Sequence, residues 1–156
     1  MTVQEAIAKN RSYRRFYQEE QISTEDLRTI VNAARLSPSG KNVQPLKYYI
    51  CNDVEMNEEI FQTLGWAGYL TEWPGPEPGE RPSAYIIQIL DKNIAPGYIC
   101  DDGITAQSMM LQAVELGLED VSSLLSKGKS WDKSYLCPKI CILSRSSLWE
   151  SPKRWW

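Results

Sequence analysis

A nearly continuous apolar run, Ala84-Tyr85-Ile86-Ile87-Gln88-Ile89-Leu90, is the feature that most constrains the fold of this chain. A strand with one face in water alternates apolar and polar residues, whereas this run does not, so it predicts a strand covered on both faces. The ten residues from 73 to 82 contain four prolines and two glycines, which predicts a surface excursion before that strand. At 156 residues the chain can bury such a core as one domain without disulfides or metals.

The flanking patterns predict helices and a second strand. Ser23 is a capping residue followed by acidic side chains, and an apolar stripe at helical spacing then runs to Ala34, so a helix should pack on the core and stop before Pro38. Further predicted elements are a helix over Val3 to Lys9 with Val3, Ala6 and Ile7 on one face, a strand over Lys47 to Cys51, and a helix from Met56 to Leu64 ending at Gly65.

The clearest helix runs from Asp101 to Leu116. Its first turn carries two aspartates, and Gly117 stands where a C-terminal capping glycine belongs. Apolar residues cover much of its circumference, which predicts a central, buried helix. Met109 and Met110 could line a cofactor pocket, although core packing is the more common role of such a pair.

Charge and composition exclude several function classes. The net charge of -3 and the pI of about 5.1 do not favour nucleic acid or a membrane surface as partners. There is no histidine, which removes histidine bases, triads and most catalytic zinc sites. The cysteines, Cys51, Cys100, Cys137 and Cys141, are expected to be reduced, mostly buried thiols of a cytoplasmic protein. We expect no metal site, no signal peptide and no membrane-spanning segment.

Two polar stretches are candidate ligand sites. Arg11-Ser12-Tyr13-Arg14-Arg15 follows the first helix, and the planar guanidinium group is the side chain best matched to phosphate oxygens. The alternative is a solvated basic patch. The second stretch is a loop in which proline and glycine fix the turns, or else an ordinary helix-to-strand connection: Ser37-Pro38-Ser39-Gly40-Lys41-Asn42-Val43-Gln44-Pro45. Together, on a chain without an obvious catalytic side chain, they suit a protein whose cofactor carries the chemistry.

The chain resembles the FMN-dependent nitroreductase family over about residues 3–118. The resemblance rests on the order of three motifs: the two polar stretches and then the helix Asp-Asp-Gly-Ile-Thr-Ala-Gln-Ser-Met-Met-Leu-Gln-Ala-Val-Glu-Leu-Gly-Leu. The resemblance implies an α+β fold, with a mostly antiparallel sheet flanked by helices, and a homodimer with two FMN molecules at its interface. It implies that Arg11, Ser12 and Arg14 contact the FMN phosphate. It also implies that Pro38, Ser39, Gly40 and Asn42 contact the flavin ring from the partner subunit.

The resemblance further implies an oxidoreductase with ping-pong kinetics. NAD(P)H would reduce the flavin, and a nitroaromatic or quinone-like acceptor would reoxidise it, so no protein side chain is expected to be catalytic. Trp66, Tyr69 and Trp73 either shape the acceptor pocket or serve as core or interface aromatics. One alternative function is a non-catalytic flavin-binding protein or a vestigial dimer. Another is a small nucleotide-binding domain that uses the arginines alone.

The chain departs from the family pattern at Asn10, where many members have arginine, at Leu46, where they have an aromatic residue, and above all after Leu118. Residues 51–120 hold 13 acidic and 2 basic side chains, whereas residues 121–156 hold 2 acidic and 7 basic ones. We therefore divide the chain into an FMN-binding domain, 1–120, and an atypical tail, 121–156, that is not a separate domain. The C-terminal strand region is expected to be incomplete or altered.

We hypothesise that this tail is translated out of frame. Losing one base from codons for Gly-Gly-Cys, the family's usual continuation, yields Glu119-Asp120-Val121, and restoring a base near Trp149 regenerates the family's terminal pattern. Resequencing the gene tests this; a native gene that encodes the tail with no one-base difference from its relatives would contradict it. Within the tail, residues 135–143 are apolar enough to pair with the sheet edge, although Pro138 interrupts the run.

Overall fold

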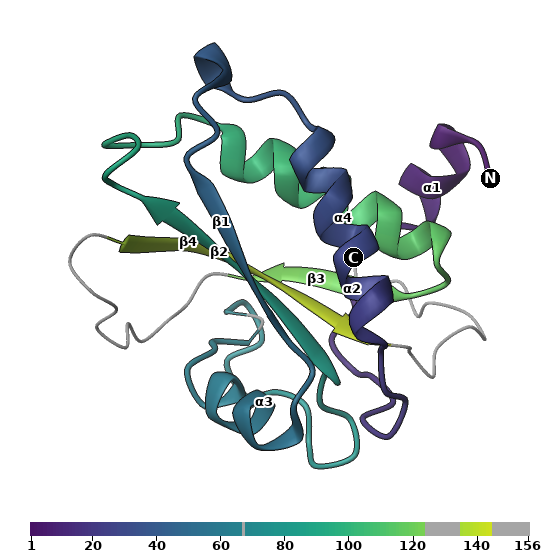
Figure 1. Cartoon of the computed structure of the whole chain (residues 1–156). Helices are drawn as coiled ribbons and strands as arrows, with labels where there is room; N and C mark the ends of the chain where they lie inside the picture. Colours follow the sequence, from purple (N-terminus) through teal and green to yellow (C-terminus); the bar gives the residue numbers. More distant parts are fainter. Residues whose placement is uncertain (67, 124–134, 145–156) are drawn as a thin grey trace.

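The computed structural model describes residues 1–66, 68–123 and 135–144, and it contains one antiparallel sheet (Figure 1). The strands are β1 (Leu46–Cys51), β2 (Ala84–Asp91), β3 (Glu119–Ser123) and β4 (Tyr135–Ser144), in the order β1-β2-β4-β3. Helices α2 (Thr24–Leu36) and α4 (Asp101–Glu115) cover one face, and α3 (Val54–Phe61) lies on the other (Figure 1). The expected α+β class, with an antiparallel sheet flanked by helices, is confirmed.

Strand β2 is buried on both faces, as its apolar run predicts. Ala84 and Ile86 belong to the apolar cluster that includes buried residues of α2 and α4, whereas Tyr85 and Ile87 belong to the cluster on the α3 side. Successive side chains of a strand point to opposite faces, so one strand supplies both cores. Gln88 is also fully buried, and its Nε2 donates a hydrogen bond to Thr105 Oγ1 of α4 at 2.9 Å.

The helix capped by Ser23 forms as expected. The Ser23 hydroxyl accepts a hydrogen bond from the Asp26 amide at 3.0 Å, and Leu27, Ile30 and Ala34 are buried. Helix α3 begins at Val54, two residues before the predicted start, and ends at Phe61, three residues before the predicted end. Asp53 accounts for the start, because its side chain accepts a hydrogen bond from the Met56 amide and so caps the helix.

Helix α1 (Val3–Lys9) has the predicted bounds, but the face that carries Val3, Ala6 and Ile7 is mostly exposed. Only Ala6 is buried, and Val3 and Ile7 are exposed. Its stability comes from a capping box, in which Thr2 Oγ1 accepts from the Glu5 amide and the Glu5 carboxylate accepts from the Thr2 amide.

The prediction that α4 is buried all round is also wrong for the isolated chain. Its buried residues, Asp101, Thr105, Ala106, Met109 and Ala113, form one stripe, and Ile104 is exposed. Gly117 ends the helix with a φ of 74°, in the left-handed region expected of a capping glycine. Cys51 is buried as expected, whereas Cys100 is exposed; the side chains of Cys137 and Cys141 lie outside the described part of the chain.

The chain beyond Leu118 contributes two strands to the same sheet. Strand β4 pairs with both β2 and β3, so it lies inside the sheet and not at the edge where it was predicted. Pro138 falls where the register between β2 and β4 shifts, between the pairs Gln88↔Lys139 and Leu90↔Leu136. A shift of this kind accommodates a residue that has no N–H to donate. Residues 124–134 and 145–156 lie outside the described part, and the out-of-frame origin of the tail stays a prediction.

The packing of α2 predicts which of its side chains carries stability. Ile30→Ala should lower the free energy of unfolding by about 2–5 kcal/mol, because Ile30 is fully buried and the sheet cannot close the cavity. Leu36→Ala, in the same helix but 68% exposed, should change it by about 0.5 kcal/mol or less. Urea unfolding followed by circular dichroism measures both. Equal effects of the two substitutions would contradict the packing of α2 described here.

Candidate functional site

The predicted ring-binding loop is tied to the first residue of α4. Asp101 is buried, and its carboxylate accepts one hydrogen bond from the Ser39 hydroxyl at 2.7 Å and another from the Gly40 amide at 3.0 Å. Ser39 Oγ in turn accepts a hydrogen bond from the Gln44 amide at 2.9 Å. The buried carboxylate thus holds the loop at Ser39 and Gly40, and the Ser39 hydroxyl holds the later part of the loop at Gln44. The sequence marked Asp101 only as a residue favourable to the helix dipole and missed this role.

The same loop contains an unusual backbone. Lys41, Asn42 and Gln44 have φ values of 53°, 55° and 54°, in the left-handed region that residues other than glycine seldom adopt. Such conformations cost on the order of 1–3 kcal/mol each and persist where surrounding contacts impose them, commonly at ligand sites. Pro38 and Asn42 are exposed, and Asn42 Oδ1 accepts a hydrogen bond from Gln44 Nε2 at 2.8 Å. The loop thus presents Asn42 to solvent in a prescribed conformation.

The arginine cluster lies directly after α1 and is also exposed. Arg11 Nη1 donates to the carbonyl oxygens of Ile7 and Asn10, at 3.1 and 2.7 Å, and Arg14 Nη1 donates to the Ser12 carbonyl at 3.0 Å. These contacts use one nitrogen of each guanidinium group and leave other N–H donors for an anion. Their positive charge and fork geometry fit a phosphate group.

Helix α4 connects both predicted motifs. Gln107 Nε2 donates to Asn10 Oδ1 at 3.4 Å beside the arginine cluster, and Ser108 Oγ accepts from Ser37 Oγ at 2.7 Å beside the loop. Asp101 and Gln107 are six residues apart, or about 9 Å along a helix. The structure therefore places the arginine cluster and the loop along one helix within the same chain. It does not test the predicted contribution of the loop to a partner's flavin site.

Two adjacent acidic residues, the buried Asp120 and the half-buried Glu119, lie near the arginine cluster, and the sequence did not single them out as part of a site. Asp120 is fully buried, it forms an isolated bridge with Ser12, and its two carboxylate oxygens accept hydrogen bonds from Asn10 Nδ2 at 3.0 and 3.2 Å. Burial raises the pKa of Asp120 to about 8 and that of the adjacent Glu119 to about 7. The two carboxyl groups are thus partly protonated near neutral pH.

The state of this acidic pair decides how well the arginine cluster suits an anion. An ionised Asp120 carboxylate beside Ser12 would repel a phosphate and attract the guanidinium groups to itself. Protonation removes much of that repulsion. The donor set of Arg11, Ser12 and Arg14 therefore fits a phosphate group at neutral pH and fits it better in mild acid.

The aromatic residues considered for an acceptor pocket do not gather at this site. Trp66 packs with Phe61 and Trp73, with ring centroids 5.5 and 6.4 Å apart, in the apolar cluster on the α3 side of the sheet. Gly75 has a φ of 114°, and a Cβ there would lie 2.7 Å from the Trp66 ring, so this position requires glycine. Tyr69 is fully exposed. In this chain Trp66 and Trp73 are packing residues.

Comparisons with known proteins agree with this arrangement. A sequence model of the Nitroreductase family matches residues 7–71, a span that includes both the arginine cluster and the loop. The solved structure of a nitroreductase family protein from Clostridium difficile 630 superposes with a TM-score of 0.78 at 23% identity, covering 99% of this chain and 90% of that one. The chain has the nitroreductase fold.

Two further structures share that fold. A nitroreductase with bound FMN from Desulfitobacterium hafniense DCB-2 has a TM-score of 0.72 at 20% identity, covering 97% of this chain and 92% of that one. An FMN-dependent nitroreductase from Clostridium difficile R20291 has a TM-score of 0.72 at 23% identity, covering 96% and 88%. A search of curated protein sequences found no match. The resemblance to the nitroreductase family inferred from the sequence is confirmed.

No group of three or more acidic or cysteine side chains among residues 1–66, 68–123 and 135–144 is arranged to hold a metal ion. Within the same ranges, no helix has the length and apolar character needed to cross a membrane.

The hold of Asp101 on the loop can be tested by amide exchange. Asp101→Ala removes the acceptor of the Gly40 amide and the Ser39 hydroxyl, so the Gly40 amide should exchange with solvent about tenfold faster, the loss expected for a hydrogen bond of about 1.4 kcal/mol. Glu25→Ala, which also removes a first-turn carboxylate, is the control. Hydrogen exchange by NMR gives both rates. An unchanged rate at Gly40 in Asp101→Ala would show that the carboxylate does not hold the loop.

The raised pKa values of Asp120 and Glu119 predict that the protein becomes less stable as the pH rises. The pKa of Asp120 is higher in the folded protein than its ordinary value of 3.8, so the folded state holds a proton that the unfolded state releases, and stability should fall as the pH rises from about 4 to about 8. The slope approaches about 1.4 kcal/mol per pH unit for one proton. Because the chain has no histidine, few other groups titrate in this range.

Asp120→Asn should keep the hydrogen bond from Asn10, remove most of this slope and be more stable than the parent protein at pH 8. The remaining slope belongs to Glu119. Urea unfolding at pH 5, 6, 7 and 8 provides the measurement, with Glu25→Gln as the exposed control. Stability of the parent protein that rises steadily from pH 5 to pH 8 would refute the buried, protonated state of Asp120.

Proposed function

We propose that this chain is an FMN-dependent oxidoreductase of the nitroreductase type, acting as a homodimer. The observation that carries the proposal is the pair of motifs along α4, in which Asp101 holds a strained polar loop and an exposed arginine cluster lies beside Asn10. The family match over residues 7–71 and the FMN-containing structures of the same fold support it.

In this proposal Arg11, Ser12 and Arg14 bind the FMN phosphate. Their exposed donors suit a dianionic group, and the protonation of Asp120 and Glu119 limits the opposing charge. The positions of Asp120 below Ser12 and of Asn10 beside it make this end of the site sensitive to pH.

In the same proposal the loop contacts the flavin ring of the partner subunit, through Pro38, Ser39, Gly40 and Asn42. Ser39 is already committed to Asp101 and Gln44, so its part is to hold the loop in position. Asn42 is exposed, and its side-chain nitrogen Nδ2 has no partner among the described residues, so Nδ2 can donate a hydrogen bond to the ring. Of the four residues, Asn42 is the one whose side chain is expected to bind the ring directly.

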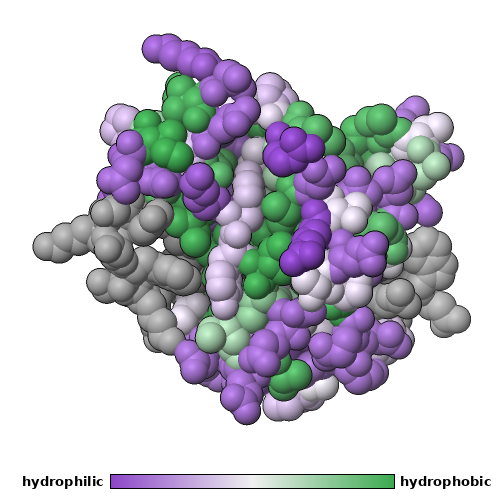
Figure 2. All heavy atoms as spheres, viewed as in Figure 1, coloured by the Kyte–Doolittle hydropathy of each residue, from purple (hydrophilic) through white to green (hydrophobic). Residues whose placement is uncertain are grey.

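The homodimer accounts for apolar side chains that the isolated chain leaves in water. The exposed ones include Val3 and Ile7 on α1, Val43 in the loop, and Ile99 and Ile104 at the start of α4. Figure 2 shows apolar side chains at the surface next to the loop and at α1, which directly precedes the arginine cluster. A partner subunit covering these residues would complete the site and remove the apolar surface from water.

Bound FMN would supply the redox chemistry, accepting a hydride from NAD(P)H and passing it to a nitroaromatic or quinone-like acceptor. The absence of histidine is consistent with this division, because the residues of the chain need only bind, orient and leave one face of the ring open. Use of NAD(P)H is supported by a neighbour of the same fold described as a putative NADH dehydrogenase/NAD(P)H nitroreductase from Parabacteroides distasonis ATCC 8503. A cytoplasmic location remains a prediction.

A non-catalytic flavin-binding or vestigial protein is the second candidate, because the buried Asp120 carboxyl group lies beside Ser12 of the proposed phosphate site. The visible spectrum of the purified protein with added FMN distinguishes the candidates. A bound flavin band that bleaches with NADH or NADPH under anaerobic conditions indicates the enzyme. A band that does not bleach indicates the binding protein, and no bound flavin indicates the vestigial one. Nucleotide binding that is lost in Arg14→Ala, without flavin, would indicate a nucleotide-binding domain.

Substitution of the loop tests the site itself. Asn42→Ala should weaken FMN binding by about two- to tenfold, the effect of losing one hydrogen bond, without changing the fold. Fluorescence titration with FMN measures the affinity, and Asn93→Ala, at an exposed position outside the site, is the control. Unchanged affinity and reduction rate in Asn42→Ala would show that the loop is wrongly assigned.

A further inference from the structure

Gln44 makes two hydrogen bonds inside the proposed ring-binding loop and is not among the residues assigned to the flavin. Its backbone amide donates to Ser39 Oγ at 2.9 Å, and its side-chain Nε2 donates to Asn42 Oδ1 at 2.8 Å. One residue thus contacts both the early part of the loop and the side chain proposed to bind the ring. Gln44 itself has a φ of 54°, a conformation that persists where surrounding contacts impose it.

The first of these hydrogen bonds belongs to a chain that begins at a buried carboxylate. The Ser39 hydroxyl has one hydrogen, which it gives to Asp101 at 2.7 Å, so its oxygen accepts from the Gln44 amide. Asp101 is 4% exposed, whereas Gln44 and Asn42 lie at the surface. The position of Gln44 is therefore held from the interior of the protein through Ser39.

The second hydrogen bond restricts the side chain of Asn42. An exposed asparagine without contacts rotates freely, and its amide can present either its oxygen or its NH₂ group to a ligand. Gln44 Nε2 occupies Asn42 Oδ1, and Nδ2 has no partner among the described residues. A hydrogen bond from Nδ2 to the ring then costs less side-chain entropy, because the amide is already oriented in the free protein.

The chemistry of glutamine suits this role. Its side-chain nitrogen is a donor, and it reaches back to a residue two positions earlier in the loop. A glutamate of the same length offers only acceptors, so at position 44 it would attract Asn42 Nδ2, the group proposed to bind the ring. Glutamine and glutamate should therefore have opposite effects on the orientation of the Asn42 amide.

We propose that Gln44 is a positioning residue of the flavin site, which orients the Asn42 amide so that Nδ2 is available to the ring. Gln44 acts through Asn42 and does not itself bind the flavin. The inference rests on the proposed function, in which Asn42 binds the ring. The orientation of Asn42 can nevertheless be observed in the flavin-free protein, so the two can be tested separately.

The flavin-free protein tests the orientation of Asn42, through ¹H–¹⁵N NMR of its side-chain NH₂ group. Gln44→Met keeps the length of the side chain and removes the donor, so it should make this group more mobile than in the parent protein, as judged by ¹⁵N relaxation. Gln44→Glu should instead move the NH₂ signal downfield, because Nδ2 then donates to a carboxylate. Equal mobility in the parent protein and in Gln44→Met would overturn the proposal. Gln44→Ala replaces Gln44→Met if the latter does not fold.

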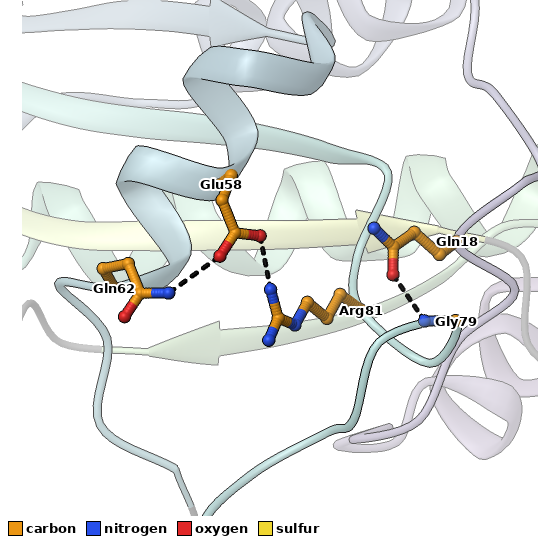
Figure 3. Close-up of polar contacts among 5 residues, drawn as sticks. All are labelled: Gln18, Glu58, Gln62, Gly79 and Arg81. Atoms are coloured by element: carbon orange, nitrogen blue, oxygen red, sulfur yellow. Dashed lines mark hydrogen bonds and ion pairs between the residues drawn. The ribbon is translucent and has the colours of Figure 1, made fainter.

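Gln62→Met is the matched control. Gln62 also uses Nε2 to donate to a nearby exposed side chain, Glu58, at 2.7 Å, but it lies at the end of α3 and away from the loop (Figure 3). This variant should leave both the mobility of the Asn42 side chain and the affinity for FMN as they are in the parent protein.

FMN binding, measured by fluorescence titration, tests whether Gln44 acts through Asn42. Gln44→Met should weaken binding by about two- to fivefold, and Gln44→Glu should weaken it further. In the Asn42→Ala background, Gln44→Met should have no additional effect. An equal loss in both backgrounds would show that Gln44 only stabilises the loop, and would overturn the proposal. A parent protein that binds no FMN would contradict the proposed function, and the NMR comparison would still decide whether Gln44 orients Asn42.

Discussion

Burial of β2 on both faces is the constraint on which the rest of this structure depends. Its alternate side chains enter two separate apolar clusters, one that includes α2 and α4 and one on the α3 side. Each cluster takes buried side chains from β2, and without either cluster β2 would expose large apolar side chains to water. Strands β1 and β4 satisfy its backbone on both sides. The two faces of the sheet can then be used for different purposes.

On the α4 face, a few polar contacts turn a helix-to-strand connection into a candidate ligand site. The Asp101 carboxylate holds Ser39 and Gly40, and Ser108 and Gln107 connect the same helix to the start of the loop and to the end of α1. A rigid helix that anchors both motifs fixes their separation within one subunit, so that in the proposed dimer the arginine cluster can bind one FMN while the loop reaches the FMN of the partner subunit. The exposed apolar residues beside them are then suited to a partner subunit.

Several buried polar groups of the isolated chain either have raised pKa values or have no hydrogen-bond partner among the described residues. Asp120 is fully buried near the arginine cluster and Glu119 beside it is half-buried, and burial raises the pKa of both carboxyl groups. Asn57, Arg81 and Tyr85 leave hydrogen-bonding atoms unpaired on the α3 face. The first group predicts a pH dependence of stability, and the second costs stability in the isolated chain. Both concern free energies of one to a few kcal/mol per group, comparable to a large part of the stability of a small domain.

The sequence by itself determined the features that arise from local patterns: the apolar run of β2, the cap at Ser23, the bounds of α1, the capping role of Gly117 and the motifs that resemble the nitroreductase family. Local pattern could not show that Val3 and Ile7 stay exposed, that only one stripe of α4 is buried or that β4 lies inside the sheet, because burial depends on what packs opposite. The role of Asp101, the protonation of Asp120 and the unpaired atoms around Tyr85 join residues far apart in the chain. Only the tertiary structure decides such contacts, since it alone sets the distance between groups and the water that remains around them.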